Sequence, residues 1–120
     1  MPILTGTCHC GAVRVTVPRR PRSVTDCNCS ICRRYGVLWA YYRAQQVKIA
    51  GARNTEAYKW GRKALNFVRC KTCGCLMCWQ RVKKDPERYM GVNWRNFPLA
   101  VVEQTRVKKL DGAAWGGHSW

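Results

Sequence analysis

Residues 26–34 read Asp26-Cys27-Asn28-Cys29-Ser30-Ile31-Cys32-Arg33-Arg34, which places three cysteines within six residues. Three thiols this close cannot all pair as disulfides, but as thiolates they can share one metal ion. The C-x-C-x-x-C spacing lets two sulfurs approach a metal from an extended turn and the third from the first turn of a helix. Zinc fits best, because thiolates at about 2.3 Å are its usual soft ligands. Three protein ligands leave one position open for chemistry, unless a fourth ligand from elsewhere makes the site structural.

The other cysteines also favour metal over disulfides. The chain has nine cysteines, an odd number, and most of them fall into short C-x-C and C-x-x-C groups. In an intracellular chain such groups are typical of metal sites. The C-x-C pair Cys8 and Cys10 and the C-x-x-C pair Cys70 and Cys73 together predict a closed four-cysteine zinc site. This site would join the first strand to one about 60 residues later and so close a long loop.

Two further cysteines leave the ligand count open. Cys75 and Cys78 have the spacing of a strand, in which free cysteines pack as small apolar residues. We favour this interpretation over a ligand role. If either thiol instead completed the set of Cys27, Cys29 and Cys32, the protein would be a purely structural scaffold with two zinc ions.

Short apolar segments at regular spacing predict an all-β fold of short antiparallel strands. The expected strands cover residues 12–17, 37–42, 46–50, 55–60, 64–69, 75–80, 89–94 and 101–105. A short helix capped by Ser30 and ended by Gly36 follows the cysteines at 27 and 29. At 120 residues we expect one domain over residues 1–120, with a loose tail from about residue 111.

The charge is strongly positive. The chain has 22 basic and 6 acidic residues, a formal net charge of +16, and two filled thiolate sites would remove about three charges. Such a surface favours an anionic ligand, which could be a phosphate backbone, an acidic membrane surface or a small polycarboxylate. The chain lacks the start of a signal peptide and any run of about 18 apolar residues, so we expect a cytoplasmic protein with no membrane partner.

Three blocks of the sequence resemble one family. They are Thr7-Cys8-His9-Cys10-Gly11, then Cys27-Asn28-Cys29-Ser30-Ile31-Cys32-Arg33-Arg34, then Cys70-Lys71-Thr72-Cys73-Gly74. In order and spacing, over roughly residues 4–110, the chain is similar to the glutathione-dependent formaldehyde-activating enzyme family, which includes the domain of centromere protein V. The resemblance implies a zinc-stapled fold described as a β-tent. It also implies a structural zinc on Cys8, Cys10, Cys70 and Cys73, and a catalytic zinc on Cys27, Cys29 and Cys32.

The activity implied by the resemblance is a carbon–sulfur lyase reaction. Glutathione adds to formaldehyde to give S-hydroxymethylglutathione, so the expected partners are a small-molecule thiol and an aldehyde. An open zinc would either bind the thiol as thiolate or polarise the aldehyde oxygen. Arg33 and Arg34 could grip a carboxylate of glutathione, although such a pair is as often simply solvated.

The alternative is a non-catalytic, zinc-stapled module that binds nucleic acid or another polyanion. Nine basic residues would carry this function: Arg19, Arg20, Arg22, Arg62, Lys63, Lys83, Lys84, Lys108 and Lys109. Such binding would weaken steeply with salt through counterion release. No recognised nucleic-acid motif is present, and most of the aromatic residues follow strand patterns. Because the three-cysteine site also leaves a ligand position open, we favour the enzyme.

Overall fold

The computed structural model describes residues 3–60 and 63–114. Within these ranges the chain is mostly β, as expected. The strands are β1 (Leu4–Thr7), β2 (Arg14–Val17), β3 (Ser23–Cys27), β4 (Trp39–Arg43), β5 (Lys48–Ala50), β6 (Thr55–Tyr58), β7 (Leu65–Cys70), β8 (Leu76–Arg81), β9 (Tyr89–Asn93) and β10 (Arg106–Leu110). The α-helices are α1 (Ser30–Tyr35) and α2 (Leu99–Glu103), and the 3-10 turns are η1 (Ala44–Gln46), η2 (Ala52–Asn54), η3 (Trp94–Asn96) and η4 (Gly112–Ala114). No helix in these ranges is long and apolar enough to cross a membrane.

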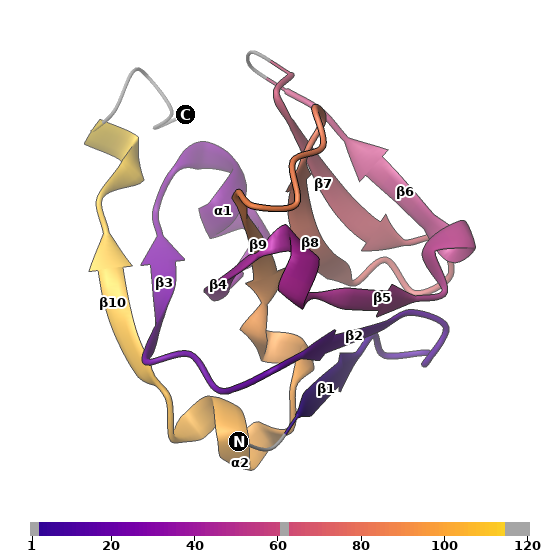
Figure 1. The fold of residues 1–120 in the computed structure, drawn as a ribbon. Helices are drawn as coiled ribbons and strands as arrows, with labels where there is room; N and C mark the ends of the chain where they lie inside the picture. The colour runs from indigo at the N-terminus through magenta and orange to yellow at the C-terminus, as the bar shows by residue number, and fades with distance from the viewer. Residues whose placement is uncertain (1–2, 61–62, 115–120) are drawn as a thin grey trace.

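The strands form two sheets (Figure 1). The small sheet has the order β1-β2-β5, and the large sheet has the order β10-β3-β4-β9-β8-β7-β6. The expectation of antiparallel strands holds for the pairs within both sheets except one, because β10 lies parallel to β3. A parallel pair needs a long connection, and here the chain crosses most of the large sheet before β10 returns to its edge.

The main core lies between the two sheets. Strand β2 contributes Val15 and Val17, which pack in one buried cluster with Ala40 and Tyr42 of β4. Because side chains alternate along a strand, the neighbouring Trp39 faces the other side of the large sheet. There it belongs to a second buried cluster that also contains the side chains of Cys27, Cys32, Val37, Phe67 and Leu76.

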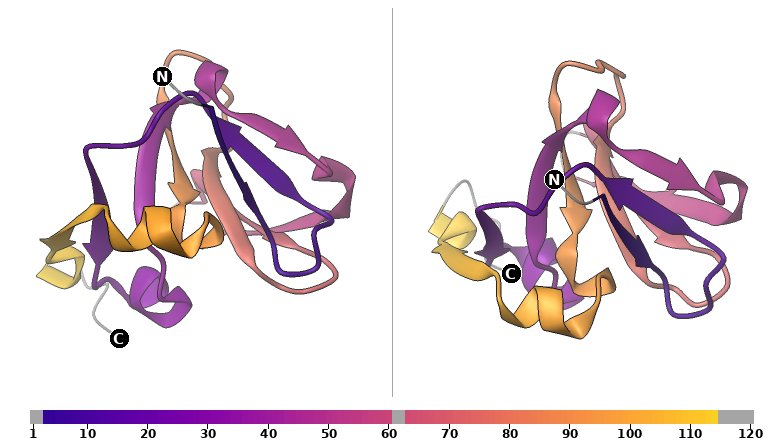
Figure 2. Two further views of the ribbon diagram at one scale, coloured as in Figure 1. Left: turned by 90° about the horizontal axis from the view of Figure 1, so that it is seen from below. Right: turned by 60° about the horizontal axis from the view of Figure 1, so that its bottom comes forward.

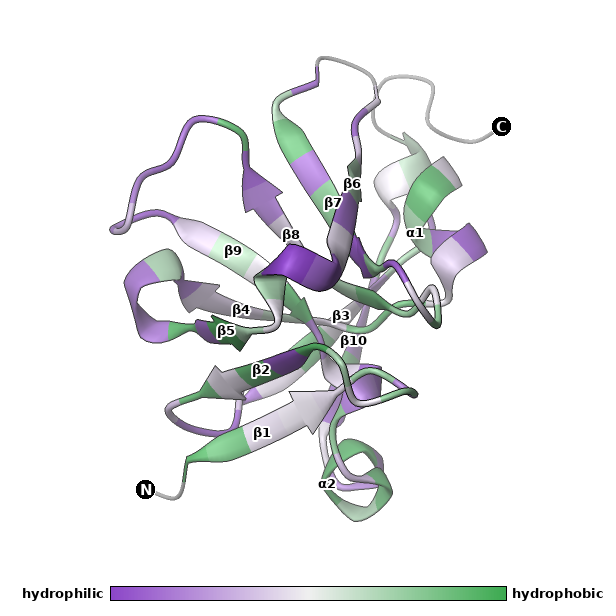
Figure 3. Ribbon diagram, turned by 90° about the vertical axis from the view of Figure 1, so that its right-hand side faces the viewer, coloured by the Kyte–Doolittle hydropathy of each residue, from purple (hydrophilic) through white to green (hydrophobic). Residues whose placement is uncertain are grey.

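The expected last strand over residues 101–105 is wrong. Val101 and Val102 belong to α2, where the backbone N–H groups of both donate to the carbonyl oxygen of Pro98. Two β-branched residues suggest a strand, but Pro98 is the N-cap residue whose carbonyl accepts the first hydrogen bonds of the helix, and partial burial of the valines against the core stabilises the helix. Figure 3 shows α2 as a mostly apolar turn beside β1.

The actual last strand follows at Arg106–Leu110, where the sequence analysis expected none. Four of its five residues are exposed, and its lysines lie at the edge of the large sheet. Charged residues are usual on an edge strand, where they oppose pairing with other chains, but they hide the hydrophobic alternation. The short strand β1 was also missed, because Gly6 is its only buried residue and its sequence shows no hydrophobic alternation.

The helix α1 begins one residue earlier than expected. Cys29, not Ser30, is the N-cap residue, and no side chain caps this end. Ser30 is a buried first residue of the helix. Gly36 ends the helix in the left-handed conformation, with φ 65°, as expected.

The end of the described chain returns to the turn between β3 and α1 (Figure 2). Asn28 Nδ2 donates to Asp111 Oδ1 over 3.0 Å, and Ala113 N donates to Asn28 Oδ1 over 2.9 Å. Residues 111–114, which the sequence analysis assigned to a loose tail, therefore form an ordered turn at this place. The rest of that tail, residues 115–120, lies outside the described residues.

Candidate metal centres and the adjoining cavity

Four thiols meet where the two sheets join. Cys8 and Cys10 come from the connection between β1 and β2, and Cys70 and Cys73 come from the end of β7 and the turn after it. Their sulfur atoms all lie within 4.8 Å of one another, and the Cys8–Cys10 and Cys10–Cys70 sulfurs are 3.6 Å apart. A tetrahedron with zinc–sulfur bonds of about 2.3 Å has edges of about 3.8 Å. The donor set therefore fits a four-coordinate zinc ion.

Hydrogen bonds from backbone and side-chain N–H groups hold these thiols in position. Val13 N donates to Cys8 Sγ over 3.3 Å, and the side chain of Asn54 donates to Cys70 Sγ over 3.4 Å. Backbone N–H groups of Cys10 and Cys75 lower the pKa of the Cys73 thiol to about 5. Hydrogen bonds to a thiolate favour the charged form that binds metal.

Three more thiols meet at the far end of β3. Cys27 ends β3, Cys29 is the N-cap of α1, and Cys32 lies in the first turn of that helix. Their sulfur atoms lie within 4.8 Å of one another, and the indole Nε1 of Trp39 donates to Cys32 Sγ over 3.3 Å. Three thiols at this separation, with their backbone at a helix start, fit a soft cation such as zinc.

The pKa values within this cluster differ by position. Burial raises the pKa of Cys32 far above the ordinary thiol value and raises that of Cys27 as well. Burial also acts to raise the pKa of Cys29, but the backbone N–H groups of Cys32 and Ile31 outweigh it, and the pKa is lowered. Free N–H groups at the start of a helix favour a negative charge, so Cys29 is the thiol that ionises first.

Two residues outside the predicted ligand set close this cluster, and neither was predicted to have a role in it. Gly112 is buried, and a Cβ placed on it would lie 2.5 Å from Cys27 Sγ and 3.2 Å from the Cβ of Cys29. Asn28 holds the turn that carries Gly112, through the two hydrogen bonds described above. Asn28 lies inside the C-x-C motif, but the motif gives it no role of its own, and Gly112 lies in a Gly- and Ala-rich tail that is typical of an ordinary loop.

A cavity of about 480 Å³ opens beside Cys27, Cys29 and Cys32. The aromatic part of its wall, which we call the aromatic chamber, is formed by Trp39, Tyr41, Trp60, Phe67 and Trp79. Aliphatic side chains complete the wall, among them Ile31, Leu65 and Leu110. Four of these rings come from β4, β7 and β8, on the face of the large sheet away from the main core, and Trp60 lies in the connection after β6. The three-cysteine cluster is thus part of a cavity wall.

The two arginines after this cluster lie outside the cavity. Arg33 and Arg34 are both exposed on α1, and Arg34 Nη1 donates to the backbone oxygen of Ser30 over 2.9 Å. Arg34 lines an adjoining hollow together with Tyr35 and Tyr58, and this hollow shares Ile31 and Trp60 with the cavity. A basic side chain therefore lies beside the apolar cavity but not in its wall.

The remaining cysteines pack with the main core. Cys78 has 0% of its surface exposed, and Cys75 is partly buried against the same cluster. Neither belongs to the groups of thiols within metal-binding distance in the described chain. Burial raises the pKa of Cys78 to about 12, as for a thiol that stays protonated. This arrangement matches the interpretation of Cys78 as a small apolar core residue and gives no support to a fourth ligand for Cys27, Cys29 and Cys32.

The basic residues lie in separate parts of the chain. Lys108 and Lys109 lie on β10 at one edge, where Lys109 pairs with Asp26 at 3.1 Å. Lys63, in the connection between β6 and β7, and Lys83 and Lys84, in the connection between β8 and β9, line a polar hollow with Arg81 and Arg88. Arg19 and Arg20 precede β3, and Arg20 donates to Gln104 over 3.3 Å, while Arg62 is outside the described residues. Within the described part of the chain, the residues expected to bind a polyanion therefore come from separate segments of the fold.

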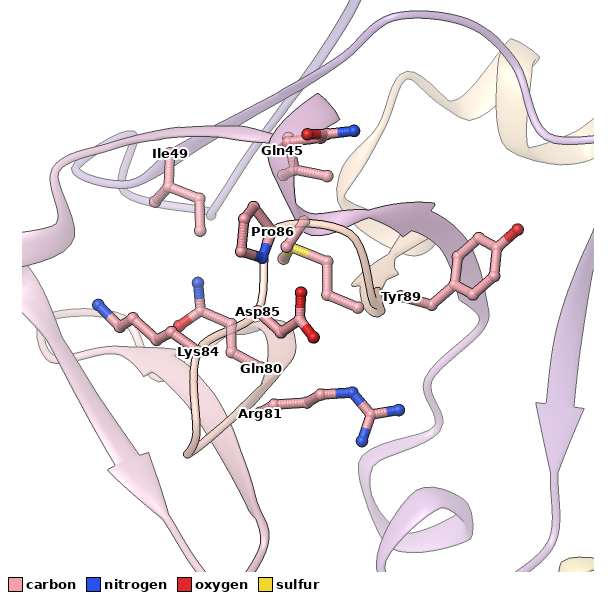
Figure 4. A pocket seen from close by; sticks show the side chains of 11 residues that line it. Gln45, Ile49, Gln80, Arg81, Lys84, Asp85, Pro86 and Tyr89 are labelled. Carbon is pink, nitrogen blue, oxygen red and sulfur yellow. The ribbon is translucent and has the colours of Figure 1, made fainter.

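Figure 4 shows a separate hollow of about 320 Å³. It lies where η1 and β5 face the connection between β8 and β9, and its labelled side chains include Gln45, Ile49, Lys84, Asp85 and Tyr89. No cysteine lines it. The thiol chemistry of this chain therefore lies elsewhere, at the two cysteine clusters.

Comparisons with known proteins agree with this arrangement. The sequence profile described as glutathione-dependent formaldehyde-activating enzyme matches residues 3–106, most of the chain. A crystal structure of a Rhodobacter sphaeroides protein from a structural genomics programme is 31% identical in sequence, with a TM-score of 0.71. The match covers 88% of this chain and 100% of that one. On the profile match, the chain belongs to the glutathione-dependent formaldehyde-activating enzyme family.

Proposed function

We propose that this protein is a zinc-dependent enzyme that adds a thiol to a small aldehyde, a carbon–sulfur lyase-type reaction of the kind named for its family. The observation that carries the proposal is the difference between the two cysteine clusters. Four thiols surround one candidate metal position, whereas three thiols form part of the wall of a cavity. A metal bound by three protein ligands retains a position for a substrate.

In this proposal Cys8, Cys10, Cys70 and Cys73 hold a structural zinc, and Cys27, Cys29 and Cys32 hold a catalytic one. When bound at the second set, zinc would supply Lewis acidity, which lowers the pKa of a substrate thiol or polarises an aldehyde oxygen. Trp39 Nε1 fixes the orientation of the Cys32 sulfur. The apolar wall of the aromatic chamber would reduce the amount of water around the reacting atoms, which would limit competing hydration of the aldehyde.

The thiol reactant in this proposal is glutathione or a similar molecule. Its carboxylates would remain outside the apolar wall, near Arg34 in the adjoining hollow and near the exposed Arg33. A guanidinium group can bind a carboxylate through two parallel hydrogen bonds. The net charge of +16 would also attract an anionic thiol to this surface.

The test measures zinc content and activity together, on the wild type and on Cys29→Ser. We expect two zinc ions per chain in the wild type and one in the variant, with loss of glutathione-dependent aldehyde consumption but retention of the fold. Cys75→Ser is the matched control, because it removes a partly buried thiol that belongs to neither cluster, and it should keep both zinc ions.

Two results would contradict the proposal. An unfolded Cys29→Ser chain would assign this zinc a structural role. One zinc in both proteins, together with salt-dependent binding of an oligonucleotide, would favour the alternative of a basic, non-catalytic module for nucleic acid or another polyanion. The hollow lined by Lys63, Lys83, Lys84 and Arg88 would then be the first surface to alter.

A further inference from the structure

We propose that the aldehyde used by this protein carries a flat apolar group about the size of a benzene ring, which occupies the aromatic chamber beside Cys27, Cys29 and Cys32. This inference rests on the proposed thiol addition and names the class of its carbonyl reactant. It departs from the one-carbon aldehyde in the name of the family.

The chemistry of the wall is the first argument. Apart from the three cysteines, the described residues that line the cavity are aromatic or aliphatic, and none of them is Lys, Arg, Asp or Glu. Transfer of a charged group into such surroundings without a partner costs far more than a hydrogen bond returns. The charged parts of glutathione therefore belong in the adjoining hollow, where Arg34 lies, and the apolar wall is left for the other reactant.

The second argument is that the chamber is already formed. The rings of Trp39 and Phe67 have centroids 6.3 Å apart, and those of Tyr41 and Trp79 are 6.2 Å apart in an edge-to-face arrangement. A Cβ placed on Gly91 would collide with the indole of Trp79 and lie 3.0 Å from the ring of Trp39. The glycine on β9 thus leaves space for both indoles to lie against the sheet. Rings held in this way offer a flat apolar ligand preformed surfaces for stacking.

The third argument is size. A cavity of about 480 Å³ is within the usual range for small-molecule sites, which is roughly 300–1,000 Å³. Formaldehyde has one carbon and one oxygen atom and would leave almost all of this apolar wall in contact with water. An aldehyde with a ring would cover it and gain the hydrophobic contribution that its burial provides.

The reaction itself balances without any oxidant or reductant. The sulfur of the thiol forms a bond to the carbonyl carbon, the carbon–oxygen π bond breaks, and the proton of the thiol ends on the oxygen. The product is a hemithioacetal, and its ring remains in the chamber while its hydroxyl group and sulfur face the three-cysteine cluster.

Binding is tested first, with zinc-loaded protein and benzyl alcohol, which has the ring but cannot react. In a titration followed by NMR of the tryptophan indole N–H groups, we expect the signals of Trp39, Trp60 and Trp79 to shift. The signal of Trp94 should not, because that side chain lies in the main core and donates to Thr105. Leu65→Asn keeps the size of a lining side chain but makes it polar, and it should weaken binding by roughly tenfold or more.

Leu99→Asn is the matched control, since Leu99 is 71% exposed on α2 and lines none of the cavities described here. If Leu65→Asn does not fold, a second variant and its control replace these two. Tyr41→Ala removes a ring of the chamber, and Tyr89→Ala removes a similarly exposed tyrosine from the hollow of Figure 4. We expect only the first of these to weaken the binding of benzyl alcohol.

Turnover separates this inference from the proposed function. With glutathione as the common thiol, and with the uncatalysed rate subtracted, we expect kcat/KM for benzaldehyde to exceed that for formaldehyde by roughly tenfold or more. Indole signals that do not move, or a formaldehyde preference that Leu65→Asn leaves unchanged, would overturn the inference. Binding of benzyl alcohol without catalysis of either aldehyde would contradict the thiol addition and still support an apolar, ring-bearing ligand.

Discussion

A glycine outside the cysteine motifs closes the three-thiol cluster. Gly112 packs its backbone against Cys27 and Cys29, so that even a methyl group has no space there. The same cluster receives a hydrogen bond from the indole of Trp39. Such contacts around metal ligands fix their orientation, and their loss usually costs metal affinity. At the scale of single residues, the site thus depends on groups that are not ligands.

Gly112→Ala should therefore weaken the binding of zinc at the three-cysteine cluster without removing a ligand. The added Cβ would lie 2.5 Å from Cys27 Sγ, so the sulfur or the turn must move. We expect the affinity for the second zinc to fall by about 10–100-fold, the usual effect of altering the surroundings of the ligands, as measured by competition with a chromogenic chelator. Ala114→Gly, an exposed position in the same turn, is the control, and an equal loss of affinity there would point to general loosening of η4 instead.

At the scale of the elements, the connection between β2 and β3 is held by a side chain of β4. The hydroxyl of Tyr42 donates to the backbone oxygen of Arg19 over 2.7 Å, and the ring is 1% exposed. Burial raises the pKa of Tyr42 well above its ordinary value, against a smaller opposing effect of Arg19. The folded protein therefore keeps this proton at a pH where an unfolded chain releases it.

Tyr42→Phe should destabilise the protein by about 1 kcal/mol near neutral pH, through loss of this hydrogen bond. The stability that the hydroxyl contributes is fully present below about pH 10, where tyrosine is protonated in both states. It is lost as the pH rises further, because only the unfolded chain ionises easily. Urea unfolding of both proteins across this range should show their difference shrinking above about pH 10, and a constant difference would contradict the assignment. Tyr89→Phe, an exposed position, serves as the control.

The sequence predicted the elements that carry clear patterns. The strands β2, β4 and β7–β9 have apolar or aromatic runs, and both cysteine clusters follow from motif spacing alone. The edge strand β10 and the helix α2 were missed, because exposed lysines hide a strand and two valines suggest one. The aromatic chamber could not be predicted either. Its rings come from β4, β7, β8 and the connection after β6, and their meeting depends on strand order and register, which a single sequence does not contain.

At the scale of the whole molecule, the two cysteine clusters connect different parts of the fold. The four-cysteine cluster joins the connection of β1 and β2, in the small sheet, to the end of β7 in the large sheet. The three-cysteine cluster lies within one region, formed by the end of β3 and the start of α1. A small domain buries a limited core, so a metal that joins its two sheets contributes to folding as a whole.

Loss of each metal should therefore affect the fold differently. We expect Cys70→Ser to lower the melting temperature strongly or to prevent folding, because zinc at structural sites can contribute about 10 kcal/mol. Cys29→Ser should melt within a few degrees of the wild type, since the two sheets and the core between them remain joined. Calorimetry measures the melting temperatures of both variants. Cys75→Ser is the control for the loss of a thiol outside the clusters. Similar large losses for Cys29→Ser and Cys70→Ser would mean that both metals are structural and would leave no open site for catalysis.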